Sequence, residues 1–100
     1  MAPNVISETY PGEQKQVAKR VHEIMAAVRA RDIDLLESYH LWGPKFTKFD
    51  DWEPLSRQDA ETTKQIEREG IGGAASFTAD ASQLKADVFG DVAIATCVMD

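Results

Sequence analysis

Apolar side chains recur at a helical spacing in the first third of the chain. They stand at i, i+4, i+7, i+8 and i+11, which places them on one face of a helix, and they are Val17, Val21, Ile24, Met25 and Val28. Pro11 suits the first turn of such a helix, where its missing N–H group costs little. The pattern predicts a helix over Pro11–Arg29 that buries its stripe against the strands of residues 84–88 and 92–99.

A second helix and a short strand are predicted next. Asp32 is a typical N-cap, because its carboxylate can accept from the free amides of a first turn, so a helix is expected over 33–40. Gly43-Pro44 ends it, since the residue before a proline avoids the helical region. Apolar and polar positions alternate imperfectly over 45–52, which predicts a short strand that turns near Asp50-Asp51.

A third helix is predicted from the run Ser56-Arg-Gln-Asp59, which resembles a capping box with Asp in the usual Glu position. The apolar face of this helix is thin, with Thr63 between Ala60 and Ile66, so it is expected at the surface. Three glycines at 70, 72 and 73 end the helix near Glu69.

The C-terminal quarter reads as an antiparallel hairpin. Residues 74–89 are expected to be extended, and their apolar parity switches near Ser82-Gln83, which indicates a β-bulge. Gly90-Asp91 is a two-residue hairpin signal, because glycine supplies the positive φ of tight turns. Folding about that turn predicts three opposed pairs, which are Val88 with Ala93, Ala86 with Ala95, and Leu84 with Cys97.

The last strand is apolar on both faces, since Val92, Ile94, Thr96 and Val98 complete its second face. Such strands are typically interior, with neighbours on both edges. We therefore expect that the strand pairs with another chain, giving a homodimer, or that the polypeptide is a shortened form of a larger domain. Helices followed by an antiparallel sheet indicate the α+β class.

Composition narrows the function classes. One hundred residues fit a flexible tail over 1–9 and one domain over 10–100. The net charge of −6 and the dispersed cations argue against a nucleic-acid partner. No apolar run suggests a membrane span or a signal peptide, so a cytoplasmic location is predicted. A single cysteine, Cys97, excludes an internal disulfide, and two histidines without ligand spacing predict no metal and no cofactor.

Three segments together resemble the nuclear transport factor two-like superfamily, whose branches include SnoaL-like cyclases and ketosteroid isomerases. They are residues 21–39, which match the long helix, the acidic N-cap and the second helix, then Phe46-Thr-Lys-Phe-Asp-Asp51, and then Val88-Phe-Gly-Asp-Val-Ala-Ile-Ala-Thr96. The resemblance covers most of residues 12–100. It implies a cystatin-like cone, in which N-terminal helices pack on a curved antiparallel sheet around a pocket, with the sheet incomplete at the C-terminus.

The resemblance also implies candidate site residues. The isomerase branch has a catalytic carboxylate near the end of its first strand, where Asp50 and Asp51 stand here. An apolar surround that favours a general base could come from four aromatic residues, Trp42, Phe46, Phe49 and Trp52. The alternative is that Asp50-Asp51 is a solvated turn pair. Ile24 stands near the position of that branch's oxyanion-stabilising tyrosine and cannot donate a hydrogen bond, which argues against steroid isomerase activity.

His40 is the third candidate catalytic residue. It closes the second predicted helix beside Trp42, and it could relay protons or hydrogen-bond a ligand; the alternative is a C-terminal helix cap. Two functions follow. The first is a SnoaL-like pocket protein that binds a small apolar or aromatic ligand, with acid–base catalysis by Asp50, Asp51 and His40. The second is a non-catalytic association module of the same fold that dimerises through the sheet.

Overall fold

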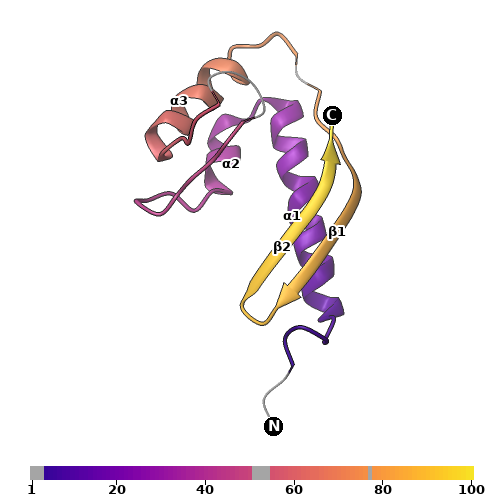
Figure 1. The fold of residues 1–100 in the computed structure, drawn as a ribbon. Helices are drawn as coiled ribbons and strands as arrows, with labels where there is room; N and C mark the ends of the chain where they lie inside the picture. The colour runs from indigo at the N-terminus through magenta and orange to yellow at the C-terminus, as the bar shows by residue number, and fades with distance from the viewer. Residues whose placement is uncertain (1–3, 51–54, 77) are drawn as a thin grey trace. The chain divides into compact units, whose positions relative to one another are not determined.

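A computed structural model describes residues 4–50, 55–76 and 78–100. The described part has an α+β architecture of three helices and one two-stranded antiparallel sheet (Figure 1). It divides into two compact units, the first formed by residues 1–26 with 78–100 and the second by residues 27–77. The calls on Asp51 and Trp52 lie outside the described residues, and the cone of the resembled superfamily stays a prediction.

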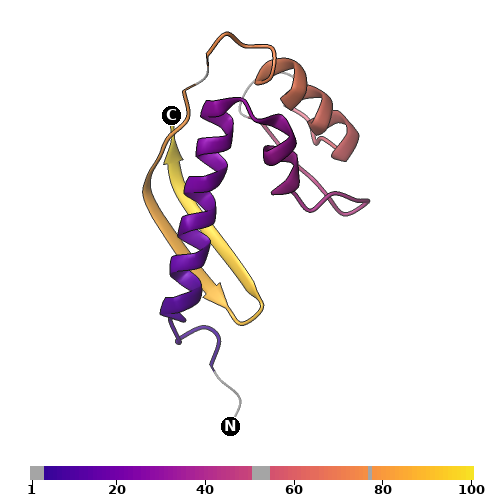
Figure 2. The same ribbon diagram turned by 180° about the vertical axis from the view of Figure 1, so that it is seen from behind.

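Helix α1, Pro11–Ala30, follows the predicted bounds closely. Its stripe faces inward as expected, because Met25 and Val28 are buried and the other three members are half-buried. In the first unit, α1 lies along the hairpin when it is viewed from the front and from behind (Figure 1 and Figure 2). The Gln14 amide ties the two elements together by donating to the Ala86 carbonyl at 3.0 Å.

The hairpin consists of β1, Ala81–Phe89, and β2, Val92–Met99, joined by Gly90 at φ 68° and Asp91. Val88 pairs with Ala93 and Ala86 with Ala95, as the turn predicts. A register shift between Ser82 and Lys85 confirms the bulge, and Gln83 within it has φ 52°.

Two details of the hairpin prediction are wrong. The strand begins at Ala81 and not at Ala74, because the residues before it form no ladder with β2. Leu84 and Cys97 do not form a one-to-one pair in the ladder, because Gln83 and Leu84 both lie in the bulge, where two residues of β1 stand opposite one residue of β2.

Burial differs between the two strands of the hairpin. On β1, Ala81 and Val88 are buried, whereas every β2 residue except Cys97 is exposed. The described sheet has two strands, so β2 is an edge strand there. In this part of the chain β2 lacks the second neighbour that a strand apolar on both faces calls for, and its pairing with another chain stays a prediction.

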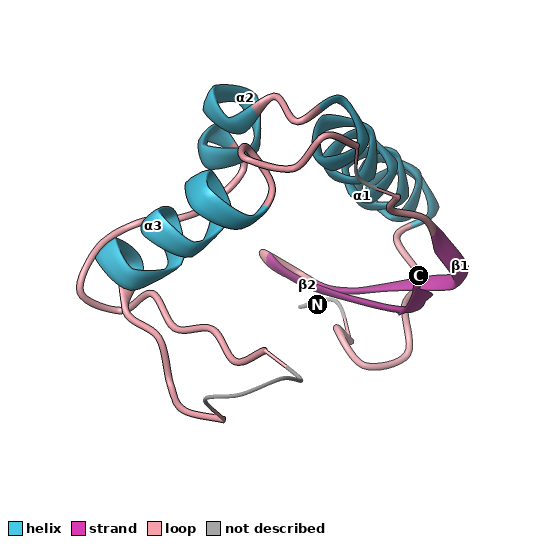
Figure 3. Ribbon diagram, turned by 90° about the horizontal axis from the view of Figure 1, so that it is seen from above, coloured by secondary structure: helices cyan, strands magenta, loops and turns pink. Residues whose placement is uncertain are grey.

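The second unit contains α2, Ile33–Ser38, and α3, Ala60–Gly70, which lie next to each other (Figure 3). The Asp32 carboxylate caps α2 by accepting from the Leu35 amide, as predicted. The cap of α3 is Asp59, three residues later than the start expected at Ser56. Of the strand predicted over 45–52, the described residues 45–50 form one bridge, in which the amide and carbonyl of Lys48 pair with the carbonyl and amide of Gln58.

The Asp59 cap makes the stability of α3 depend on pH. The Thr62 backbone amide donates to Asp59 at 2.9 Å, and this bond, followed by one from the Thr62 hydroxyl, lowers the pKa of Asp59 below its ordinary value of 3.8. A carboxyl whose pKa is lower in the folded state stabilises that state above the ordinary value, and the contribution disappears as pH falls through the lowered pKa. We expect acid to loosen α3 below about pH 4.

Asp59→Asn is the matched control, because asparagine is an equally good N-cap but carries no charge. The variant should retain helix content by circular dichroism and lose part of the acid dependence of unfolding. An acid dependence identical to that of the unchanged protein would contradict this role of Asp59.

Candidate functional site

Buried polar side chains gather in the second unit. Thr63, Glu67 and Gln58 have exposed fractions of 0%, 4% and 7%. Thr63 and Glu67 are four residues apart, so α3 carries them on one inward face. A protein interior accepts such groups only when they are hydrogen-bonded or ion-paired, so their partners define the site.

The centre of the site is a contact between His40 and Glu67. The two side chains approach to 3.0 Å between Nε2 and Oε1, and the His40 Nδ1 lies 2.9 Å from the Leu36 carbonyl oxygen. Both imidazole nitrogens thus face acceptors. An imidazole nitrogen that carries a proton donates and one that does not accepts, so the contacts fix the orientation of the ring between Glu67 and Leu36.

Lys48 links this pair to Asp50. Its ammonium lies 3.2 Å from Asp50 Oδ1 and 4.0 Å from Glu67 Oε1. The other Asp50 oxygen accepts from the Gln58 amide at 2.7 Å, and the Gln58 carbonyl oxygen accepts from the Thr63 hydroxyl at 3.0 Å. The Asp50 side chain is only 6% exposed, so Asp50 is not the solvated turn residue of the alternative interpretation.

We refer to His40, Lys48, Asp50, Gln58, Thr63 and Glu67 as the ionic network. The Lys48 ammonium faces both carboxylates, and His40 faces that of Glu67, so each acid has a nitrogen partner. These contacts account for the presence of polar groups at low exposure. One atom is not accounted for, because Glu67 Oε2 is buried and has no hydrogen-bond partner among the described residues.

An aromatic group lies against the ionic network. The rings of His40 and Trp42 are stacked, with centroids 4.5 Å apart and an interplanar angle of 8°, and Phe46 is 4.8 Å from Trp42. The Trp42 indole N–H donates to the Glu37 carbonyl at 2.9 Å, which fixes the ring. The Lys64 ammonium lies 5.0 Å from the centre of the Trp42 ring, at cation–π distance.

The structure therefore brings together three of the predicted site residues, His40, Trp42 and Phe46, and joins Asp50 to them through Lys48 and Glu67. Phe49 makes none of these ring contacts; the residue is 57% exposed, and the Arg57 guanidinium lies over its ring at 4.7 Å.

Sequence reasoning missed Glu67, Gln58 and Thr63. The sequence carries a weak signal for two of them. Helix α3 has few apolar residues for its inward face, and Thr63 and Glu67 take inward positions there.

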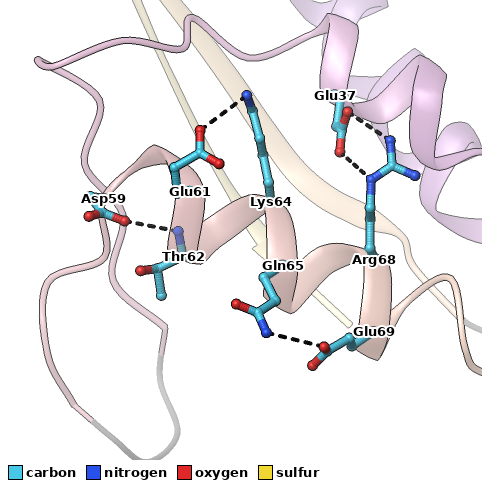
Figure 4. A pocket seen from close by; sticks show the side chains of 8 residues that line it. All are labelled: Glu37, Asp59, Glu61, Thr62, Lys64, Gln65, Arg68 and Glu69. Atoms are coloured by element: carbon cyan, nitrogen blue, oxygen red, sulfur yellow. Dashed lines mark hydrogen bonds and ion pairs between the residues drawn. The ribbon is translucent and has the colours of Figure 1, made fainter.

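The hollows in the surface of the second unit lie beside this site. One, of about 570 Å³, runs along α3; Lys64 is paired there with Glu61 and Arg68 with Glu37, while Asp59 and Glu69 accept from the amides of Thr62 and Gln65 (Figure 4). Arg68 contacts Glu37 at 2.9 Å and Asp34 at 3.0 Å, and these carboxylates raise its pKa. A second hollow, of about 470 Å³, has Trp42 and Lys64 in its wall. Both hollows are open to solvent. Because Trp42 lies in the wall of the second one, a ligand could reach the aromatic group from that side.

The contacts also limit the chemistry. Both nitrogens of His40 and both oxygens of Asp50 are engaged, so acid–base catalysis requires a ligand to replace one of these contacts. The described residues contain no group of three or more His, Cys, Asp or Glu side chains that could hold a metal ion. In that same part of the chain, no helix is both long and apolar enough to cross a membrane.

Comparison of the chain with models of known families, with curated proteins and with solved structures finds no match. The resemblance to the nuclear transport factor two-like superfamily accordingly stays a prediction.

Proposed function

We propose that the protein is an association module in which two copies join through β2. The observation that carries this proposal is the exposure of β2. Its large apolar side chains are 62% exposed at Val92, 54% at Ile94, 46% at Val98 and 63% at Met99. Isolated exposed apolar residues are ordinary, but a continuous apolar strand at a sheet edge is a pairing surface.

The outer face of the hairpin supports this function. In the ladder, Phe89 pairs with Val92 and Asp87 with Ile94, so an apolar row follows β2 while β1 carries polar groups. Lys85 and Asp87 form an ion pair at 2.9 Å on β1. An apolar centre with a charged rim is the usual anatomy of an interface.

The chemistry of the edge favours a second copy of the same chain. Edge strands normally prevent pairing by means of charged residues and proline. Residues 92–99 contain neither. An uncharged strand is complementary to itself in an antiparallel arrangement about a two-fold axis. The superfamily that the chain resembles also supplies oligomerisation domains.

Sedimentation equilibrium at concentrations from low micromolar to near millimolar tests the proposal. We expect a reversible monomer–dimer equilibrium. A single monomeric species throughout this range would overturn it, and so would pairing of β2 with a strand of a longer form of the same chain.

A second candidate function is supported by the aromatic group beside the ionic network. We propose in this case a SnoaL-like site that binds a small aromatic molecule against Trp42 and Phe46, with His40 and Asp50 as acid–base groups. Aromatic walls with a few convergent polar groups are typical of small-molecule sites.

Titration with 2-naphthol, followed through the Trp42 indole resonance in NMR spectra, tests this candidate. We expect saturable shifts, with a dissociation constant that rises about twofold to tenfold in Phe46→Leu, since stacked aromatic contacts contribute roughly 0.5–1.5 kcal/mol each. Phe49→Leu is the matched control, because Phe49 lies apart from the group, and it should leave binding unchanged. Equal effects of the two variants would contradict a site at Trp42.

A further inference from the structure

An ammonium group lies on the face of the Trp42 ring. It belongs to Lys64, whose Nζ is 5.0 Å from the ring centre and 3.6 Å from Glu61 Oε1. An ammonium group over an indole face is the arrangement by which proteins recognise organic cations. The ring is fixed for this role, because His40 stacks against it and the Glu37 carbonyl accepts from its N–H group.

The hollow of about 470 Å³ beside this ring carries more negative than positive charge. Asp59, Glu61 and Lys64 share its wall with Trp42. The Thr62 amide lowers the pKa of Asp59, which is therefore a carboxylate at neutral pH. An anionic ligand would meet two carboxylates here, whereas a cationic ligand is attracted to them. The charges of the wall thus favour the same class of ligand as the indole face.

Lys64 is held at the ring by weak contacts. Its side chain is 34% exposed, and its ion pair with Glu61 joins two exposed residues three positions apart on α3, a kind of pair that contributes little. A primary ammonium is also strongly hydrated, so it gains little by leaving water. A quaternary ammonium ion keeps the positive charge but has no N–H group to hydrate. Such an ion can therefore displace Lys64 from the ring.

We propose that the hollow beside Trp42 binds a quaternary ammonium ion, and that Lys64 occupies the ring when no ligand is bound. Binding there does not require the association of two copies, because the hollow lies outside β2. The site shares Trp42 with the small-molecule candidate described above. It differs in requiring a positive charge, which 2-naphthol lacks.

Choline and its uncharged carbon isostere, neohexanol, test this site. The two molecules have the same shape and differ in whether the branched centre is a charged nitrogen or a neutral carbon. Each is titrated against the protein while the Trp42 indole resonance is followed by NMR. We expect saturable shifts with choline and a dissociation constant about fivefold or more below that for neohexanol. Equal binding of the two would overturn the proposal.

A trimethyllysine blocked at both ends distinguishes a free amine from a methylated protein as the source of the cation. Binding weaker than that of choline would indicate a free amine, and tighter binding would indicate a methylated lysine side chain. Either order supports a cation site, whereas binding of neither cation would overturn it.

Lys64→Ala tests whether Lys64 occupies the ring. Removal of this internal competitor raises the fraction of protein that is ready to bind, so the dissociation constant for choline should fall about threefold or more. Lys45→Ala is the matched control, because it removes the same charge from an exposed position of the same unit outside the wall of the hollow. It should change the constant by less than about twofold. Equal effects of the two variants, or no effect of Lys64→Ala, would overturn the role of Lys64.

Discussion

Replacing Glu67 with alanine should lower the free energy of unfolding of the second unit by about 3–5 kcal/mol, the cost of removing one partner from a buried ion pair. Glu67 is 4% exposed, and it faces His40 Nε2 at 3.0 Å and the Lys48 ammonium at 4.0 Å. Its loss removes the acceptor that faces His40 Nε2, leaves Lys48 with Asp50 as its carboxylate partner, and opens a cavity on the inward face of α3. Urea unfolding followed by far-UV circular dichroism and Trp fluorescence measures the change.

Glu61→Ala is the matched control on the same helix. Glu61 is 87% exposed and lies 3.6 Å from Lys64, so its removal should change stability by about 0.5 kcal/mol or less. A double-mutant cycle isolates the pair itself. If His40 and Glu67 interact as the structure indicates, His40→Ala should cost much less in the Glu67→Ala background than alone. Additive losses would refute the coupling.

Replacing Ile94 with lysine should weaken dimer formation by about a hundredfold or more. Ile94 is 54% exposed and lies in the middle of β2, so each dimer would contain it twice. Burial of one such side chain contributes roughly 1.5–3 kcal/mol, and each 1.4 kcal/mol is a factor of ten in the dissociation constant. The two ammonium groups near the axis would add repulsion and a desolvation cost.

Leu41→Lys provides the comparison. Leu41 is 91% exposed in the second unit, outside β2, and the same change of charge there should leave the dissociation constant unaltered. Sedimentation equilibrium of the two variants at the same ionic strength measures both constants. If Ile94→Lys dimerises as strongly as the unchanged protein, β2 is not the interface.

The site was only partly predictable. His40 and Trp42 were found because they are close in sequence, and the structure stacks their rings. Asp50 was found through the resemblance, but its engagement by Lys48 and Gln58 could not be foreseen. Gln58 is eight residues away and reaches Asp50 through an isolated bridge that has no periodic pattern. Glu67 lies 27 positions beyond His40 in the chain, and nothing in the local sequence joins them.

Sequence alone determined the features that depend on neighbours along the chain. The bounds of α1, the Asp32 cap, the turn at Gly90 and the bulge near Gln83 follow from helical spacing, a side-chain acceptor and turn geometry. The hairpin register also follows, because a two-residue turn fixes the pairing of the strands on either side.

Tertiary structure decided which of these elements cover one another and which polar groups meet. β2 is apolar at nearly every position, yet all its residues except Cys97 are exposed, whereas Ala81 and Val88 on β1 are buried. Apolar periodicity shows which positions tend to avoid water but not which of them another element covers. The ionic network required α3 to bring Glu67 to His40, since Coulomb and hydrogen-bond energies depend on separation in space and not on separation along the chain.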